Sequence, residues 1–267
     1  MKFYLIEGGT THLEAAASLG RLILYRIQVL GRSGIFIFAA IVQAFVPPFR
    51  ISRLVKEIDF IGSKSFLIIF VTALFTGMVI GIQGFYSLSQ FGAEAALGIM
   101  VALSIIRELG PVLCALMVAG RAGSAITAEI GIMKITDQFP ALEMMAVDPL
   151  KYVVSPKIMA GIISLPLLTA FFDLIGIAGG YLVGVNLLGV NEGAYIGKLV
   201  AAVEFKDIYG GIIKSLCFGL IITWIATFVG YTAEGTTEGV SRATTDTVVL
   251  ASLSILIVDY ILTSLLL

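Results

Sequence analysis

The sequence predicts an all-α integral membrane protein. Of its 267 residues, 58% are hydrophobic and only 13% are charged, whereas an average soluble domain carries about 25% charged residues. A soluble chain of this size could not hide so much apolar surface in its core and still present a polar exterior. Five apolar windows are long enough to cross about 30 Å of hydrocarbon, which takes about 20 helical residues. These observations exclude a soluble enzyme, a disordered chain and a nucleic-acid-binding module.

Residues 1–50 are expected to form an interfacial region ahead of the spans. Between 13 and 32, apolar residues recur at helical spacing while the arginines lie largely off their stripe, which is typical of an amphipathic helix in the headgroup layer. A short first transmembrane helix is the alternative. The stretch 34–49 is too short for an easy crossing and ends in two prolines, so we interpret it as a re-entrant or interfacial hairpin arm. The arginines are Arg21, Arg26 and Arg32.

The segment 65–267 is predicted to be the five-span core of a single membrane domain that comprises residues 1–267. Glycines four residues apart in the first and third spans suggest close helix contacts, because small residues let two backbones approach each other. The alternative is that glycine is simply frequent in membrane helices. The spans are predicted at about 65–88, 93–120, 158–188, 209–230 and 246–267. The glycines are Gly77, Gly81, Gly176, Gly180 and Gly184.

Lysines and arginines in the connections predict the orientation, because cytoplasmic loops carry an excess of both. The connections 50–64 and 121–157 each hold four basic residues, whereas 89–92 holds none and 189–208 holds two. Both basic connections and the N-terminus are therefore expected in the cytoplasm. Alternation then places 231–245 on the cytoplasmic side and the C-terminus on the opposite side. The start, MKFYLIEGG, lacks the apolar stretch of a cleavable signal peptide.

The connection 121–157 is too long to be a structureless loop in a compact protein. Thr136, followed by an acidic residue, is a reasonable helix start. Leu142, Met145 and Ala146 would share one face of a short helix that ends before Pro149. A short, Met-containing helix of this kind could insert into a groove of a partner protein. The alternative is a helix that rests on the membrane surface.

The run RELGPVLCALMVAGRAGSAITAEIGIMKITDQFPALEMMAVDPLKYVVSPK resembles the signature region of MlaE-type permeases, the membrane subunits of ABC systems that move phospholipids between the two membranes of Gram-negative bacteria. The similarity continues through GIQG at 81–84, ISLPLL at 163–168, IIKS at 212–215, TWIA at 223–226 and GVSRATT at 239–245. It covers about residues 60–265, and a block this long is far more specific than a short motif.

The resemblance implies a permease subunit of an ABC transporter that helps to maintain the lipid asymmetry of the outer membrane. The family fold has an interfacial N-terminal helix and five transmembrane helices. The implied partners are a second copy of this chain, a cytoplasmic ATPase dimer, a small regulatory subunit and a periplasmic MCE-domain ring. The implied location is the bacterial inner membrane, with the C-terminus in the periplasm. The cytoplasmic segment would carry a coupling helix, with candidate ATPase contacts Glu129, Lys134, Glu143, Met144, Met145 and Asp148.

The chain itself is not expected to be an enzyme or to hold a cofactor. It contains no G-x-x-x-x-G-K-[ST] phosphate loop, so ATP would be hydrolysed by the partner subunit. His12 is the only histidine, which argues against a metal site, and no catalytic residues are assigned. Cys114 and Cys217 lie in apolar runs and are interpreted as small hydrophobic residues.

Charged residues inside the predicted spans are the candidate functional groups, since each costs about 2.5–3.5 kcal/mol to insert. Arg107 and Glu108 lie near the middle of the second span, Lys214 early in the fourth and Asp259 in the last. We expect pairs between Lys214 and Glu108 and between Asp259 and Arg107. These pairs could be purely structural, or Arg107 and Lys214 could meet the phosphate of a lipid headgroup. Asp173 is expected to be a locally hydrogen-bonded acid without a family role.

Apolar side chains toward the outer end of the first span could form an acyl-chain wall, because methionine and aromatic residues are adaptable. Tyr86 could equally belong to an interfacial aromatic belt. The candidate wall residues are Met78, Ile82, Phe85 and Tyr86.

Two other classes of protein remain open at this point. A secondary transporter or channel that works without an ATPase would show acidic relays and broken spans in matched halves, of which only isolated acids are present. A non-transporting membrane scaffold is the other. Purification with or without an ATPase that co-elutes would separate the three classes.

Overall fold

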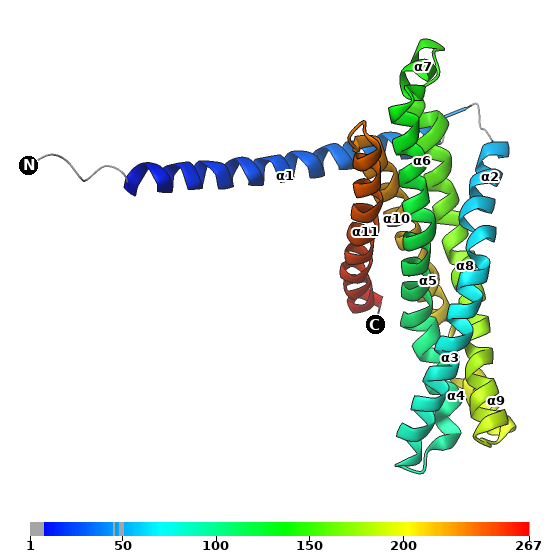
Figure 1. Cartoon of the computed structure of the whole chain (residues 1–267). Helices are drawn as coiled ribbons and strands as arrows, with labels where there is room; N and C mark the ends of the chain where they lie inside the picture. The colour runs from blue at the N-terminus through cyan, green and yellow to red at the C-terminus, as the bar shows by residue number, and fades with distance from the viewer. Residues whose placement is uncertain (1–7, 45, 48–50, 267) are drawn as a thin grey trace, which may run out of the picture.

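The computed structural model describes residues 8–44, 46–47 and 51–266, with side chains described at residue 24 and from residue 27 onward (Figure 1). The predictions for the MKFYLIEGG start and for the side chains of His12, Arg21 and Arg26 therefore fall largely outside the described residues. Within the described part, the chain contains helices and turns only. Six of its helical stretches are long and apolar enough to cross a membrane, so the predicted all-α membrane fold is confirmed.

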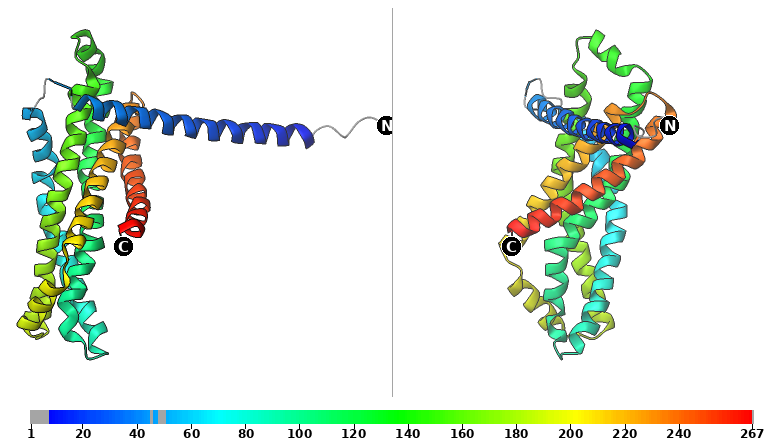
Figure 2. Two further views of the ribbon diagram at one scale, coloured as in Figure 1. Left: turned by 180° about the vertical axis from the view of Figure 1, so that it is seen from behind. Right: turned by 90° about the vertical axis from the view of Figure 1, so that its left-hand side faces the viewer.

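Helix α1 (Gly8–Ala44) is a single long helix that lies crosswise to the bundle at one of its ends (Figures 1 and 2). The prediction of a separate re-entrant arm at 34–49 is wrong, because 34–44 continue α1 without a break. The reason is tertiary packing: Phe36 and Ala40 face Val154 and Ile158 in a small buried cluster, which favours a continuous helix as far as Ala44. The window Ile27–Ala44 is one of the six apolar stretches.

The other five stretches form the upright bundle, and four of them extend at least eight residues beyond their predicted limits. The first runs over Ile51–Ser89 and the second over Glu94–Ile135, so parts of 50–64 and 121–157 are helical, not connecting loops. Lys157, only 1% exposed, explains much of this extension. Its ammonium lies 2.9 Å from a carboxylate oxygen of Glu57 and 2.8 Å from one of Glu129. These ion pairs join three helices, and all three residues lie within the predicted connections 50–64 and 121–157.

The regular helices of the bundle are interrupted by short tighter or wider turns. The α-helices are α2 (Ile51–Ile61), α3 (Phe66–Ser89), α4 (Leu97–Ser104), α5 (Gly110–Val118), α6 (Ser124–Ile135), α7 (Gln138–Met144), α8 (Ser155–Tyr181), α9 (Glu192–Ala202), α10 (Phe205–Thr232) and α11 (Thr237–Leu266). The 3₁₀ turns are η1 (Ser63–Ser65) and η2 (Glu94–Ala96). The π-helical turns are η3 (Ile105–Leu109), η4 (Ala119–Gly123), η5 (Leu150–Val154) and η6 (Leu182–Leu187).

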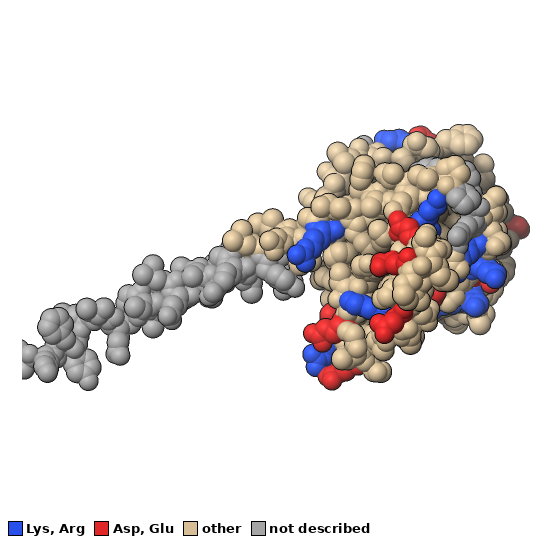
Figure 3. All heavy atoms as spheres, turned by 90° about the horizontal axis from the view of Figure 1, so that it is seen from above, with Lys and Arg blue, Asp and Glu red and all other residues tan. Residues whose placement is uncertain are grey.

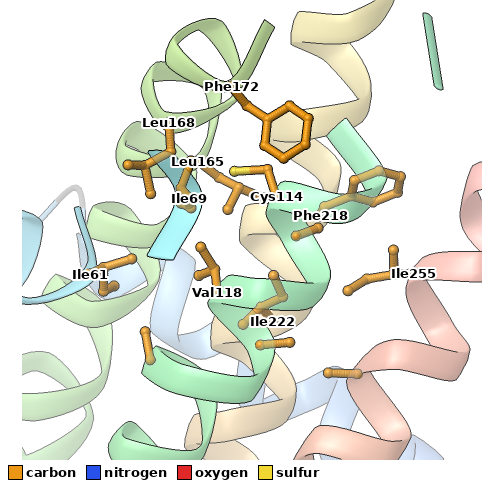
Figure 4. Close-up of a cluster of buried hydrophobic side chains, with 14 of the residues drawn as sticks. Ile61, Ile69, Cys114, Val118, Leu165, Leu168, Phe172, Phe218, Ile222 and Ile255 are labelled. Carbon is orange, nitrogen blue, oxygen red and sulfur yellow. The ribbon is translucent and has the colours of Figure 1, made fainter. Parts of the chain in front are cut away.

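Helices α3 and α8 pack closely through the glycines that the sequence singled out. A Cβ placed on Gly77 would lie 1.8 Å from the carbonyl oxygen of Gly176, and one on Gly81 would lie 3.2 Å from that of Gly180. The prediction of close contacts at these glycines is confirmed, because no side chain fits between the two backbones. Next to them, apolar side chains of α5, α8 and α10 fill the core, including Cys114, Phe172 and Phe218 (Figure 4). Cys114 and Cys217 are free, as interpreted.

The two ends of the bundle carry different elements. Helices α1 and α7 and the turn between α10 and α11 lie at one end, and α9 and the turn between α3 and α4 lie at the other (Figure 1). The grouping of these connections agrees with the alternation inferred from the basic residues, whereas the C-terminal end of α11 lies partway along the bundle (Figure 1). Seen from the α1 and α7 end, side chains of both charges gather around the bundle axis (Figure 3).

Two residues with positive φ flank helix α7: Asp137 at 53° directly before it, and Ala146 at 55° two residues after its end. The helix therefore ends at Met144, a few residues earlier than predicted. The backbone N–H groups of Ala146 and Val147 bond back to Glu143 and Leu142, which closes the helix before Pro149 is reached.

Candidate functional site

A break in the second long helix creates the centre of the candidate site. Pro111 lacks an N–H group, so the carbonyl of Arg107 has no helical donor four residues later. The helix widens into the π-helical turn η3 just before this proline. The ammonium of Lys214, from α10, donates to the Arg107 carbonyl oxygen at 2.9 Å. A buried cation from another helix thus satisfies the carbonyl that the proline leaves open.

Lys214 is 3% exposed and uses all of its donors. Besides the Arg107 carbonyl, it donates to Glu108 Oε2 at 2.6 Å and to Thr263 Oγ1 at 2.7 Å. Asp259 Oδ1 lies 3.1 Å from the ammonium as an ionic contact without a hydrogen bond of its own. The predicted pair of Lys214 with Glu108 is confirmed. Lys214 organises three helices and has no donor left for a further ligand.

Arg107 is arranged differently from Lys214. Its side chain is 41% exposed, and its Nε donates to Asp207 Oδ1 at 2.8 Å. The prediction that Arg107 pairs with Asp259 is therefore wrong, because Asp259 lies against Lys214. Both Nη groups of Arg107 are without a hydrogen-bond partner among the described residues. They are the open, permanently charged donors of the cluster.

A cavity of about 180 Å³ opens over this cluster. The start of α10 forms one wall: Glu204 and Asp207 form a reciprocal capping box there, which holds Asp207 in place for Arg107. Lys206 is exposed beside them and adds a second open cation. The cavity is lined by Arg107, Glu108, Glu204, Lys206, Asp207, Gly210, Gly211, Lys214, Thr263 and Leu266.

The candidate acyl-chain residues lie elsewhere. Met78, Ile82, Phe85 and Tyr86 are on α3, and the structure does not bring them to the cavity over Arg107. Ile82 and Tyr86 are exposed on the outside of the bundle, while Phe85 is partly buried against its core.

The six candidate ATPase contacts separate into two groups. Glu129 and Lys134 lie on α6 and bond within the chain: Glu129 pairs with Lys157, and Lys134 donates to carbonyls at the C-terminus of α10 at 2.7 and 3.1 Å. Four others lie on α7 or in the turn after it. Met144 and Met145 are 83% and 64% exposed. The second group is Glu143, Met144, Met145 and Asp148.

Sequence reasoning missed Asp207, Lys206 and Thr263. Asp207 was placed in the connection 189–208, outside the fourth span, although it lies seven residues before Lys214 and so on the same face of a helix. Thr263 follows Asp259 by one helical turn. The expectation for Asp173 is not met, since its Oδ1 is buried with no hydrogen-bond partner in the described chain and lies against Gly110.

The fold and the polar cluster define a multi-pass, all-α membrane protein with a charged cavity among its helices. The family model described as "Permease MlaE" matches residues 54–265, and the chain belongs to this family. It is 48% identical to the intermembrane phospholipid transport system permease protein MlaE of Haemophilus influenzae, over 93% of this chain and 95% of that protein. It is 42% identical to a probable ABC transporter permease protein of Rickettsia bellii, over 95% and 98% of the two chains. The chloroplastic protein TRIGALACTOSYLDIACYLGLYCEROL 1 of Arabidopsis thaliana is 33% identical, over 78% of this chain and 60% of that protein.

Proposed function

We propose that this chain is the permease subunit of an ABC transporter that moves phospholipids between the inner and outer membranes. The observation that carries the proposal is a guanidinium with two open Nη groups, Arg107, inside a pocket among spanning helices. Near full-length similarity to a permease named for intermembrane phospholipid transport supports it. Transport of this kind would maintain the lipid asymmetry of the outer membrane.

In this proposal, Arg107 binds the phosphate of the headgroup. A forked guanidinium can donate two parallel hydrogen bonds to a phosphate, which offsets part of the hydration that the phosphate loses. Lys206 would add a cation at the rim of the pocket. Lys214 acts indirectly: it holds the Arg107 backbone and Glu108 in place, so that the charges stay ordered when no lipid is bound.

Two copies of the chain around a two-fold axis would enclose the lipid. The exposed α3 side chains Ile82 and Tyr86, with Met78 and Phe85 beside them, remain candidates for contact with acyl chains in that assembly. A periplasmic MCE-domain ring would exchange lipid at the α9 end. The proposed location is the bacterial inner membrane, with the N-terminus in the cytoplasm and the C-terminus in the periplasm.

The ATPase dimer, with its small regulatory subunit, would bind at the α7 end. Exposed methionines on a short helix suit insertion into a groove, because methionine adapts to irregular apolar surfaces. Replacing both Glu143 and Met145 by alanine should uncouple ATP hydrolysis from transport while the chain still inserts. A matched control, Glu94→Ala with Met100→Ala at the opposite end, should leave coupling intact. Normal lipid transport by the α7 double variant would contradict the docking role.

The decisive experiment is purification from the native membrane followed by lipid analysis. The proposal expects an ATPase to co-elute, phospholipid to be identified in the complex by mass spectrometry, and ATP-dependent transfer of labelled phospholipid from complex-containing vesicles to an acceptor. Transport of a solute without any ATPase would instead support a secondary transporter or channel. A purified, assembled complex that contains no lipid and transfers none would overturn the proposal.

A further inference from the structure

The end of α1 is fastened to the segment that directly follows α7. Gln43 Nε2, in the last turn of α1, donates to Asp148 Oδ2 at 2.6 Å. Beyond the helix end, the carbonyl oxygen of Pro47 accepts a hydrogen bond of 2.8 Å from Lys151 Nζ. Two charged groups of the segment therefore hold two polar groups at the end of α1, and hydrogen bonds that involve a charge are stronger than neutral ones.

The same contact continues with buried groups. Ser155 Oγ, at the start of α8, donates to the Ala40 carbonyl oxygen at 2.8 Å, and both residues are buried. Farther along α1, Trp224 Nε1 of α10 donates to the Ser33 carbonyl oxygen at 3.0 Å. An apolar cluster lies between these bonds and excludes water from them, which makes the attachment rigid. The cluster consists of Phe36, Ala40, Val154 and Ile158.

Helix α2 holds the segment from another side. Arg53 Nη1 donates to the Tyr152 carbonyl oxygen at 2.9 Å, and its guanidinium lies 3.4 Å from the centre of the Tyr152 ring. The carboxylate of Asp148 also accepts from the backbone N–H of Leu150 at 2.8 Å, so it orders the first turn of η5 while it binds Gln43. The π-helical turn η5 is thus held in place by contacts with α1 and α2. Turns of this type are rare and occur mostly as single turns inside α-helices.

Helix α7 itself projects from the bundle (Figure 1). It is attached through the end of α6, through this fastened segment, and through the ring of Phe139, whose centre lies 5.3 Å from that of Tyr231 on α10. A force that a partner applies to α7 can therefore pass through Asp148–Ser155, through α6, or through the contact of Phe139 with α10. Resting on the proposed ATPase docking at α7, we propose that α1 and the segment 148–155 move as one rigid unit, which transmits the movement of α7 to the long crosswise helix. We call the two hydrogen bonds from Gln43 to Asp148 and from Lys151 to Pro47 the clamp, and Gln43 and Lys151 are its positioning residues.

A reversible crosslink tests whether α1 and the segment move together. In the complex with the ATPase partner, Gln43→Cys and Asp148→Cys are joined by a short bis-methanethiosulfonate reagent, in a background with Cys114→Ala and Cys217→Ala. The linked complex should transport at least as well as the same complex after reduction, because the link replaces the Gln43–Asp148 bond that the two cysteines remove. Loss of transport that reduction restores would overturn the proposal, because it would show that the two parts must separate.

Release of the clamp gives the opposite perturbation. Gln43→Ala with Lys151→Ala should lower the phospholipid moved per ATP hydrolysed by about tenfold, which corresponds to ~1.4 kcal/mol of lost coupling, while ATP hydrolysis continues. The single variant Lys151→Arg should keep most of the phospholipid moved per ATP hydrolysed, because a donor to the Pro47 carbonyl is kept. The matched control is Gln90→Ala with Lys198→Ala, two exposed residues near the other end. Unchanged transport per ATP in the released variant would contradict the clamp.

The crosslinking rate separates this inference from the proposed function. It should be equal, within about twofold, in the nucleotide-free complex and in the complex trapped with ADP and vanadate, whatever the substrate is. A rate that changes strongly between the two states would overturn the rigid unit even if phospholipid transport is confirmed. A constant rate in a complex that moves no phospholipid would refute the proposed function alone.

Discussion

The different surroundings of Lys214 and Arg107 predict different failures when each cation is removed. Lys214→Met removes three hydrogen bonds and one ionic contact from a group that is 3% exposed, and it leaves Glu108 and Asp259 without a cation. Breaking a buried ion pair in this way costs about 3–5 kcal/mol. Because the Glu108 side chain is 40% exposed, water screens part of the loss, and we expect about 3 kcal/mol.

Arg107→Gln should be much milder for stability. Its one ion pair within the described residues joins a 41% exposed side chain to Asp207, so the loss should be about 1 kcal/mol. For a chain of this size, each kcal/mol shifts the unfolding temperature by roughly 2–4 °C. Lys214→Met should therefore unfold roughly 6–12 °C lower, and Arg107→Gln only a few degrees lower.

The assay measures unfolding temperature and bound phospholipid per assembled complex on the same preparations. Arg107→Gln should lose at least about tenfold in bound phospholipid, because a bidentate charged contact to phosphate is removed. Lys214→Met should lose lipid only in proportion to its loss of assembled complex. Lys198→Met and Arg242→Gln, at exposed cations away from the cavity, are the matched controls. Unchanged lipid content in assembled Arg107→Gln, or a Lys214→Met complex of normal stability that lacks lipid, would refute the assignment of roles.

Three further changes test the packing and the topology. Gly77→Ala should cost at least about 1–3 kcal/mol in thermal unfolding, since its Cβ would lie 1.8 Å from a backbone oxygen of α8. Gly197→Ala, with open space around it, should be nearly neutral, and equal stability of the two variants would refute the close contact. Lys157→Met should lower the free energy of unfolding by about 3 kcal/mol because Glu57 and Glu129 lose their common cation, and a neutral result would mean that water already screens this cluster. Arg32→Cys, exposed on α1, should react with a membrane-impermeant maleimide from the cytoplasm only; labelling from the periplasm would mean that α1 crosses the membrane.

The sequence alone was sufficient for the class of protein, the approximate spans and the grouping of the connections at two ends. These properties depend on local apolar length and on counts of basic residues, because a backbone in lipid must satisfy its own hydrogen bonds within each helix. The close approach at Gly77 and Gly176 was also visible, since spacing along one helix reports which residues share a face. The pairing of Glu108 with Lys214 could be predicted for a different reason: a charged residue in a span needs an opposite charge, and the spans contain few of them.

Tertiary structure decided which charge meets which and where the helices end. Lys157 lies 100 residues from Glu57, and Arg107 lies 100 residues from Asp207, so no local pattern encodes either pair. These distant partners make it possible for segments with charged residues to continue as helices into the bundle, because a paired charge costs far less to bury than an isolated one. The continuity of α1 likewise depends on a surface that α8 and α10 supply only after folding. Hydropathy is a property of each segment by itself, whereas the partner of a charge is a property of the assembled bundle.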